Sequence, residues 1–207
     1  LPYFAKGYEG RQTKDDYLLF VGQAFPRRHL KETILAFEKL SKDFPDLKLI
    51  AVGPDKYPKL TINPLVAEIN KKLNREVIIH KERVEKEELN ALYSNAKALV
   101  YVSDREAFGL PPMEGLVFGV PPVVMDNELG HELFGNYAFY CPSLKDNNPS
   151  EALAKEGVLI DNIAKTIKQS LTDQPKTDKI KSEGPEFVKR YNWKNFADKF
   201  FETIKNG

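Results

Sequence analysis

The chain has 207 residues, of which 42% are apolar, so it can build one large or two small domains with a real core. Its 31 basic and 30 acidic side chains nearly cancel, which argues against a protein that binds nucleic acid or a membrane surface through overall charge. The single cysteine, Cys141, excludes an internal disulfide and a cysteine-built metal cluster, and it fits a reducing compartment. The sequence has no apolar run of about 18 residues, so no transmembrane segment is predicted.

Apolar runs alternate with helical patterns along most of the chain. Residues 1–16 show no periodicity and are interpreted as a linker that enters a domain. Helical spacing places Leu30, Ile34 and Phe37 on one face, and Asn63 followed by Pro64 is typical of a helix start. Strands are predicted at 17–21, 47–52, 77–79, 98–102, 120–125 and 137–140. Helices are predicted at about 30–43, 63–73, 85–95, 112–119, 129–136, 150–173, 176–190 and 193–205.

This alternation predicts an α/β domain with a parallel, doubly wound sheet and helices on both faces. Each connection is short, and no stretch resembles a hairpin. We find no internal repeat and no linker after residue 16, so residues 17–207 are interpreted as one domain. The closing helices have no strands of their own, and they must pack on the sheet or on a part of the protein that this sequence lacks.

The stretch from Ala98 to Met125 contains the first candidate site. A buried strand ends in a polar turn, the tight turn Phe108-Gly109-Leu110-Pro111 follows, and Pro112 suits the first turn of a short helix. Glu106 in the loop and Glu114 on the helix are separated by seven residues. Open α/β sheets bind ligands at such strand ends. The alternative is that Glu106 caps the turn and Glu114 is a surface residue.

The loop after the first strand contains the second candidate site. Arg27 and Arg28 stand just before a helix, where guanidinium groups and backbone N–H groups favour an anion. The alternative is that both arginines are solvated. His29 is a candidate anion contact or a neighbour of the helix cap, and Ser103 could equally bond a ligand oxygen or cap its turn.

Several common sites are excluded because their motifs are missing. The sequence has no Gly-rich phosphate loop ending in Lys-Ser/Thr and no Gly-x-Gly-x-x-Gly after the first strand. It has no serine in a Gly-x-Ser-x-Gly elbow. The three histidines are not spaced as a zinc site, and no Asp-x-Asp pair offers a clamp for a divalent metal.

The remaining motifs resemble those of one family. Glu106-Ala107-Phe108-Gly109-Leu110-Pro111, then Glu114, then Gly119-Val120-Pro121 are similar to the Glu-x7-Glu signature of retaining GT-B glycosyltransferases of the group 1 type. Val21-Gly22 with Pro26-Arg27-Arg28-His29 resembles that family's first loop. Glu87-Glu88-Leu89 with Leu92-Tyr93 resembles one of its helices, and Tyr191-Asn192-Trp193 resembles the segment before its last helix. The match runs in order through residues 17–205.

The resemblance implies a Rossmann-like domain, the C-terminal half of a GT-B fold, which binds a nucleotide-diphospho-sugar without a metal or other cofactor. By that resemblance Glu114 binds the ribose, and Glu106 lies beside the donor sugar as a catalytic residue. Gly22 and the backbone of Phe108, Gly109 and Leu110 contact the donor, and Val84 lies at the base. Arg28, with Arg27 as a second cation, neutralises the diphosphate as the second catalytic residue.

The sequence departs from the family pattern at a few positions. Gln23 stands where the family often has arginine, which removes one phosphate cation unless Arg27 substitutes for it. Arg28 replaces lysine, which keeps the charge and changes its reach. Glu82 replaces a glycine near the base contacts, which leaves those contacts open, and Gly115 replaces alanine.

The resemblance also implies an N-terminal acceptor domain, which these residues lack. The expected function is the donor-binding half of a hexosyltransferase that acts on a glycan or a lipid-linked acceptor and is inactive as the isolated fragment. The alternatives are a non-catalytic nucleotide-sugar-binding module, which needs a separate acceptor subunit, and a sugar-nucleotide epimerase. The expected location is cytoplasmic. Peripheral contact with the inner membrane surface through the acceptor domain stays open, and no nucleic-acid partner is expected.

Overall fold

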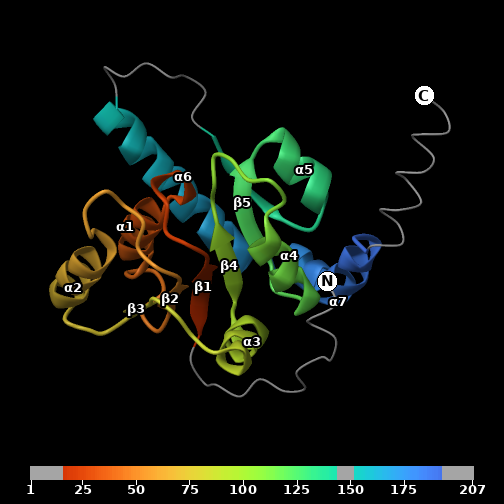
Figure 1. Ribbon diagram of the computed structural model, residues 1–207, viewed down its shortest axis with the longest axis horizontal. Helices are drawn as coiled ribbons and strands as arrows, with labels where there is room; N and C mark the ends of the chain where they lie inside the picture. Colours follow the sequence, from red (N-terminus) through yellow and green to blue (C-terminus); the bar gives the residue numbers. More distant parts are fainter. Residues whose placement is uncertain (1–15, 144–151, 193–207) are drawn as a thin grey trace.

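A six-stranded parallel sheet forms the centre of the computed structural model (Figure 1). The structure describes residues 16–143 and 152–192. The strand order is β3-β2-β1-β4-β5-β6, so the predicted parallel, doubly wound α/β sheet is confirmed. The strands are β1 (Tyr17–Val21), β2 (Lys48–Val52), β3 (Ile78–Lys81), β4 (Ala98–Tyr101), β5 (Pro122–Asp126) and β6 (Phe139–Pro142).

Helices connect successive strands, and two further helices follow β6. Short 3-10 turns at Pro26–Arg28 and Val188–Arg190 precede α1 and follow α7. The α-helices are α1 (Leu30–Leu40), α2 (Ile62–Leu73), α3 (Lys86–Asn95), α4 (Leu110–Val117), α5 (Glu128–Phe134), α6 (Ala152–Thr172) and α7 (Gln174–Phe187).

The order of the strands reverses between β1 and β4. From β1 the chain moves outward to β2 and β3, and it then returns to place β4 on the other side of β1, where Leu18 pairs with Ala98. Loops that leave the carboxyl ends of these two strands diverge toward opposite edges of the sheet. Open α/β sheets bind ligands at such a switch point, so the fold itself indicates where a site can form.

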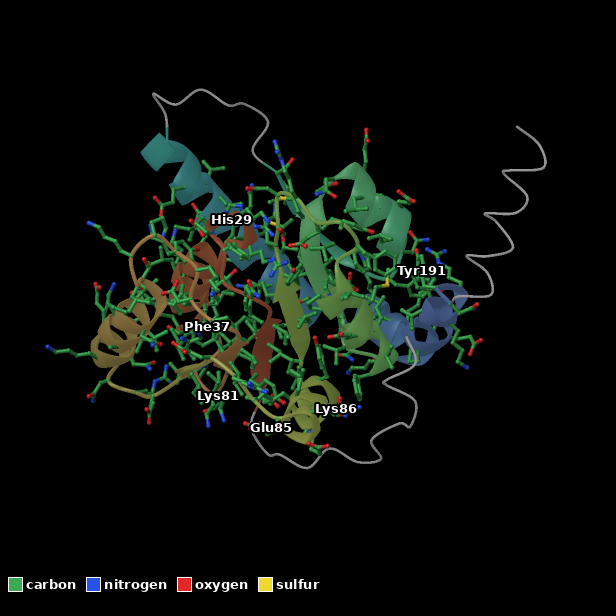
Figure 2. The ribbon with its side chains drawn as sticks, in the orientation of Figure 1. His29, Phe37, Lys81, Glu85, Lys86 and Tyr191 are labelled. Carbon is green, nitrogen blue, oxygen red and sulfur yellow. The ribbon has the colours of Figure 1, made fainter. Side chains whose placement is uncertain are left out.

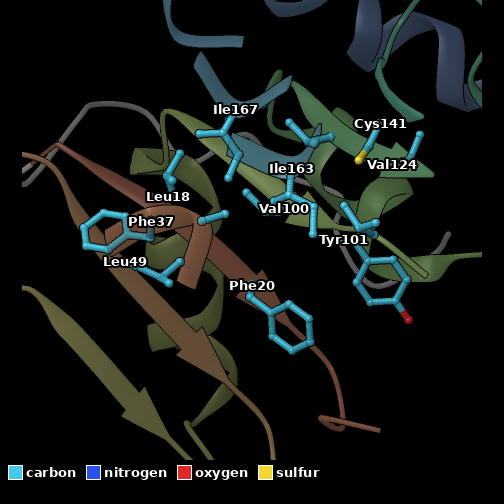
Figure 3. Close-up of a cluster of buried hydrophobic side chains, with 14 of the residues drawn as sticks. Leu18, Phe20, Phe37, Leu49, Val100, Tyr101, Val124, Cys141, Ile163 and Ile167 are labelled. Atoms are coloured by element: carbon cyan, nitrogen blue, oxygen red, sulfur yellow. The ribbon is translucent and has the colours of Figure 1, made fainter. Parts of the chain in front are cut away.

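Side chains of β1 alternate between two apolar layers, as a strand buried on both faces requires. Leu18 and Phe20 belong to the large cluster that includes Phe37 of α1, which is labelled in Figure 2, and Ile163 of α6. Figure 3 shows part of this cluster, in which Phe37 of α1 and Ile163 and Ile167 of α6 lie with side chains of the strands. Tyr17, Leu19 and Val21 belong to the second cluster, which contains Tyr93 of α3. The strand is therefore a fixed base for the loop that follows it.

The ends of β1 and β2 lie in close contact through two glycines. A Cβ atom on Gly53 would lie 2.0 Å from the carbonyl oxygen of Gly22, and both residues have positive φ angles that favour glycine. The N–H of Gly22 donates to the carbonyl of Val52 at 2.8 Å. The backbone at Gly22, where the loop after β1 starts, thus lies too close to Gly53 for a side chain at residue 53.

The closing helices pack on elements of the described domain. Helix α6 contacts α1 and β6, and α7 contacts α4. Of the three helices predicted at the end of the chain, the first two are α6 and α7. The third, 193–205, lies outside the described residues, as do residues 1–15 of the predicted linker.

Most predicted helix starts differ from the observed ones by one or two residues, and α2 and α4 show why. Helix α2 starts at Ile62 after Thr61, and Asn63 lies inside the helix, because the carboxylate of Asp55 accepts the N–H groups of Thr61 and Ile62. Helix α4 starts at Leu110, two residues before Pro112. Gly109 precedes it with φ +69°, a left-handed conformation that costs glycine little.

Candidate nucleotide-sugar site

The loops after β1 and β4 meet at the switch point. The N–H of Asp104 donates to the carbonyl of Arg27 at 3.0 Å. The side chain of Asp104 also bonds His29, which precedes α1 and is labelled in Figure 2. Oδ1 of Asp104 lies 2.9 Å from Nε2 of His29. The two candidate sites that the sequence places 70 to 80 residues apart therefore form one surface of the folded domain.

Arg28 and Glu106 form a bidentate ion pair across these loops. Nε of Arg28 donates to Oε1 of Glu106 at 2.6 Å, and Nη2 donates to Oε2 at 3.1 Å. Nη1 of Arg28 donates to the carbonyl of Gln23 at 3.2 Å. The two side chains are 15% and 16% exposed, so the pair is shielded yet reachable from solvent. A planar guanidinium held in this way recognises carboxylates and phosphates alike.

Two hydroxyl groups of the β4 end also hold Glu106. Tyr101 and Ser103 donate to Oε1 of Glu106 at 2.9 and 3.1 Å. Burial raises the pKa of Glu106, but hydrogen bonds from Arg28 and Tyr101 outweigh it, so the pKa lies below its usual value. Glu106 is therefore an ionised acceptor. The structure does not support the alternative that Glu106 caps the turn, because its carboxylate oxygens accept from the side chains of Arg28, Tyr101 and Ser103.

Glu114 lies apart from this pair and bonds a different helix. The hydroxyl of Tyr93, on α3, donates to Oε2 of Glu114 at 2.7 Å. Burial raises the pKa of Glu114, and the hydrogen bond from Tyr93 opposes that shift. The interpretation of Glu114 as an ordinary surface residue is wrong, since its carboxyl group is shielded between α3 and α4. One oxygen is held by Tyr93, which leaves acceptor capacity for a ligand hydroxyl.

The start of α4 offers few backbone N–H groups for hydrogen bonds. Pro111 and Pro112 have no N–H, so the donors at the helix start come from Gly109 and Leu110. A small hollow of about 30 Å³, open to solvent, lies between this turn and α5. Its polar lining includes Tyr101, Ser103 and Glu106. Gly109 and Glu106 therefore line the same hollow, at the positive end of the helix dipole.

The other predicted site residues lie around this centre. A Cβ on Gly22 would lie 3.2 Å from Nη1 of Arg28, so Gly22 lines the guanidinium. Arg27 is exposed and stacks over the ring of Phe25 at 4.5 Å. Val84 precedes α3 and packs against the second apolar cluster, and its side chain is not among the contacts of the Arg28 pair. The ring of Phe108 contacts the ring of Tyr191, as described below.

Sequence reasoning missed the supporting side chains. Tyr93 and Tyr101 were assigned only to a helix and a buried strand, yet both donate to the candidate carboxylates. The signal was available in part, because a tyrosine at the carboxyl end of a buried strand carries a hydroxyl that needs a partner. The link between His29 and Asp104 joins residues 75 positions apart, and no local pattern indicates it.

His29 makes the stability of the joined loops depend on pH. Burial lowers the pKa of His29, but Asp104 and Glu32 outweigh it and raise the pKa from 6.5 to about 9. A group whose pKa is raised on folding stabilises the fold fully below its unfolded pKa, and this contribution is lost as pH rises through the folded value. We expect the unfolding free energy to fall between pH 6.5 and about 9.

Urea unfolding at pH 6 and pH 9.5 checks this expectation. His29→Asn removes the titrating group and keeps a residue type that tolerates the left-handed backbone at φ 48°. The variant should show a flatter pH dependence than the wild type. His131→Asn is the matched control, because His131 bonds Asp126 on the exposed surface. Equal pH dependence in the wild type and His29→Asn would contradict the assignment.

The parallel sheet and the charged switch point define a Rossmann-like α/β domain of the kind found in GT-B glycosyltransferases. The chain belongs to the family "Glycosyl transferases group 1", whose model matches residues 5–187. The predicted family is thereby confirmed.

A curated relative is 32% identical over 130 residues: the O-antigen chain mannosyltransferase RfbU of Salmonella typhimurium. The match covers 63% of this chain and 35% of RfbU, so the chain spans about a third of the length of that relative.

Solved structures share the fold. The pneumococcal O-GlcNAc transferase GtfA, in complex with UDP and GlcNAc, matches with TM-score 0.74 and 20% identity, over 98% of this chain and 37% of that one. The C-terminal domain of the group 1 glycosyl transferase LpcC from Francisella tularensis matches with TM-score 0.68 and 17% identity. That alignment covers 89% of this chain and 94% of the LpcC domain.

The described residues contain neither a membrane-spanning helix nor a cluster of metal-ligating side chains. None of the helices that the structure describes is both long and apolar enough to cross a membrane. Within the same parts of the chain, no group of three or more His, Cys, Asp or Glu side chains is placed to hold a metal ion.

Proposed function

We propose that this chain is the donor-binding domain of a metal-independent, retaining hexosyltransferase. Its donor is a nucleotide-diphospho-sugar, and its acceptor is a glycan or a lipid-linked glycan that a further domain binds. The relative named as a mannosyltransferase favours mannose as the transferred sugar. The observation that carries the proposal is the shielded Arg28–Glu106 pair at the switch point, with Glu114 on the adjoining helix.

The chemistry of the leaving group explains why these residues suit the reaction. Cleavage of a sugar–phosphate bond places growing negative charge on the diphosphate, and fixed positive groups lower the energy of that state. Arg28 supplies a planar cation, and the start of α4 supplies the N–H groups of Gly109 and Leu110. Glu106, the partner of Arg28, lines the same hollow as Gly109, which supports a role for the protein's own groups in stabilising the departing diphosphate.

The carboxylates have separate roles in this proposal. Glu114 accepts hydrogen bonds from the ribose hydroxyls with the oxygen capacity that Tyr93 leaves. Glu106 stays ionised, so it can accept sugar hydroxyls and stabilise positive charge that develops on the sugar ring. The diphosphate and Glu106 then compete for the guanidinium of Arg28, and donor binding rearranges the pair.

Calorimetry on the 207-residue chain tests the proposal. The ligands are UDP, GDP and ADP and their hexose derivatives, each with and without EDTA. We expect binding of one nucleotide class, unchanged by EDTA. A folded sample that binds none of them would overturn the proposed function, and binding that EDTA abolishes would overturn metal independence.

The retaining outcome needs the complete enzyme. Proton NMR of the glycosidic bond formed from an α-linked donor should show an α-linked product, and a β-linked product would overturn the retaining assignment. The proposal places the enzyme in the cytoplasm, where a single thiol such as that of Cys141 stays reduced.

A further inference from the structure

Tyr191 contacts the turn that precedes α4. It follows the 3-10 turn Val188–Arg190, where the chain leaves α7 (Figure 2). Its ring meets the ring of Phe108 edge-on, with centroids 5.4 Å apart and an interplanar angle of 86°. This geometry is the favourable edge-to-face arrangement of two aromatic rings. The contact joins residues 108 and 191, so the end of the described chain reaches the candidate donor site.

The position of Tyr191 is itself fixed by α5 and by its neighbours. Its hydroxyl donates to the carbonyl of Leu133 at 2.8 Å, in the last turn of α5. The guanidinium of Arg190 lies over its ring at 4.7 Å, and the ring of Phe187 meets it at 6.4 Å. A side chain held at its tip and on its ring has little freedom, so it can fix what it touches.

Helix α5 also supports the same turn at the next residue. A Cβ on Gly109 would lie 3.6 Å from Cζ of Phe134, the last residue of α5. Phe134 is buried, whereas Leu110 beyond the turn is 50% exposed. Phe108 and Gly109 thus lie against two aromatic rings, those of Tyr191 and Phe134, while Leu110 faces solvent.

We propose that Tyr191 is a positioning residue for this turn. By holding Phe108 it keeps the N–H groups of Gly109 and Leu110 aimed at the distal phosphate of the donor. The inference rests on the proposed function, since it assigns Tyr191 a part in holding the donor. N–H groups that are fixed before the ligand arrives bind it more tightly than N–H groups that must be ordered on binding. Glu114 lies a helical turn further on, so ribose contacts should not depend on Tyr191.

Nucleotide affinities of the 207-residue chain test the inference. The ligands are the diphosphate that binds the wild type, from UDP, GDP and ADP, and the matching monophosphate. We expect Tyr191→Ala to weaken diphosphate binding by roughly five- to tenfold and monophosphate binding by less than about twofold. Tyr191→Phe keeps the ring against Phe108 and should restore diphosphate affinity to within about twofold of the wild type. If Tyr191→Ala does not fold, Tyr191→Leu replaces it with the same expectation.

Tyr137 provides a matched control from the same aromatic group. Its ring lies 4.3 Å from that of Phe187, and its hydroxyl donates to Glu183 at 2.8 Å. Tyr137→Ala should lower stability and leave diphosphate affinity unchanged. An equal loss of diphosphate affinity in the Tyr137 and Tyr191 variants, or wild-type affinity in Tyr191→Ala, would overturn the inference and leave the proposed function standing. A folded wild type that binds no nucleotide would overturn the proposed function, and with it the inference.

Discussion

Replacement of Arg28 by alanine is expected to weaken binding of a nucleoside diphosphate by roughly 10- to 100-fold, as loss of a two-pronged charged contact does. The guanidinium is held by Glu106 and by the carbonyl of Gln23, in a shielded position beside Gly22. Arg28→Lys keeps the charge and loses the planar fork, so its affinity should fall between those of the wild type and Arg28→Ala. Isothermal titration calorimetry of the three proteins measures the effect.

The same change should also destabilise the fold, and a second substitution separates the two effects. Without Arg28 the shielded carboxylate of Glu106 loses its counter-charge and keeps only the hydroxyls of Tyr101 and Ser103, which costs about 1–3 kcal/mol. Glu106→Gln added to Arg28→Ala removes that charge, so stability should recover while diphosphate affinity does not. Recovery of both would show that Arg28 acts only on the fold.

Arg27→Ala is the control for overall charge. It removes the same charge from an exposed residue that stacks on Phe25. We expect Arg27→Ala to lower diphosphate affinity by less than about threefold, because exposed charges are screened. An equal loss in the Arg27 and Arg28 variants would contradict a specific role for the Arg28 fork and would favour a diffuse basic surface.

Glu114→Ala is expected to weaken binding of nucleoside diphosphates and monophosphates alike, by about tenfold or more, since a buried charged hydrogen bond to the ligand is lost. The two ligand classes share the ribose, so the Arg28 and Glu114 variants should differ in which ligands they bind more weakly. The Arg28 variants lose diphosphate affinity above all, and the Glu114 variant loses affinity for every nucleotide. The same titrations check this difference.

Tyr93 needs its own control, because its buried hydroxyl loses its partner in Glu114→Ala. Adding Tyr93→Phe removes that unpaired donor, so stability should recover by about 1–2 kcal/mol without a recovery of affinity. Tyr93→Phe alone should reduce affinity only a few-fold, since the Glu114 carboxylate remains. Unchanged monophosphate binding in Glu114→Ala would contradict the ribose assignment.

The strands could be predicted because burial on both faces leaves a plain sequence signal. The five consecutive apolar residues at 17–21 and the five at 98–102 are typical of strands in a parallel sheet. The starts of α2 and α4 could not be placed, because they depend on distant or conformational features. Asp55 caps α2 from the preceding loop, and Gly109 adopts a left-handed backbone that the sequence permits but does not require.

The candidate site could be predicted residue by residue but not as a geometry. Motifs indicated Arg28, Glu106 and Glu114, yet the ion pair joins residues 78 positions apart, and each partner could have faced solvent instead. The hydroxyls of Tyr93 and Tyr101 were hidden by their burial, since aromatic residues in a core predict packing first. Which carboxylate bonds which hydroxyl follows only from how α3, β4 and α4 are placed.

The contact between Arg28 and Glu106 has a consequence for selectivity among anions. Glu106 is attached to the same chain, so its effective concentration at the guanidinium is far above that of any free ion, on the order of millimolar or more. Inorganic phosphate or sulfate in solution must displace this tethered competitor with one charged group alone. In the proposed function, a nucleotide-diphospho-sugar brings its base and ribose as further attachment points, so we expect it to open the pair at a lower concentration than a small anion does. The Arg28–Glu106 pair is thus expected to disfavour the binding of the commonest small anions.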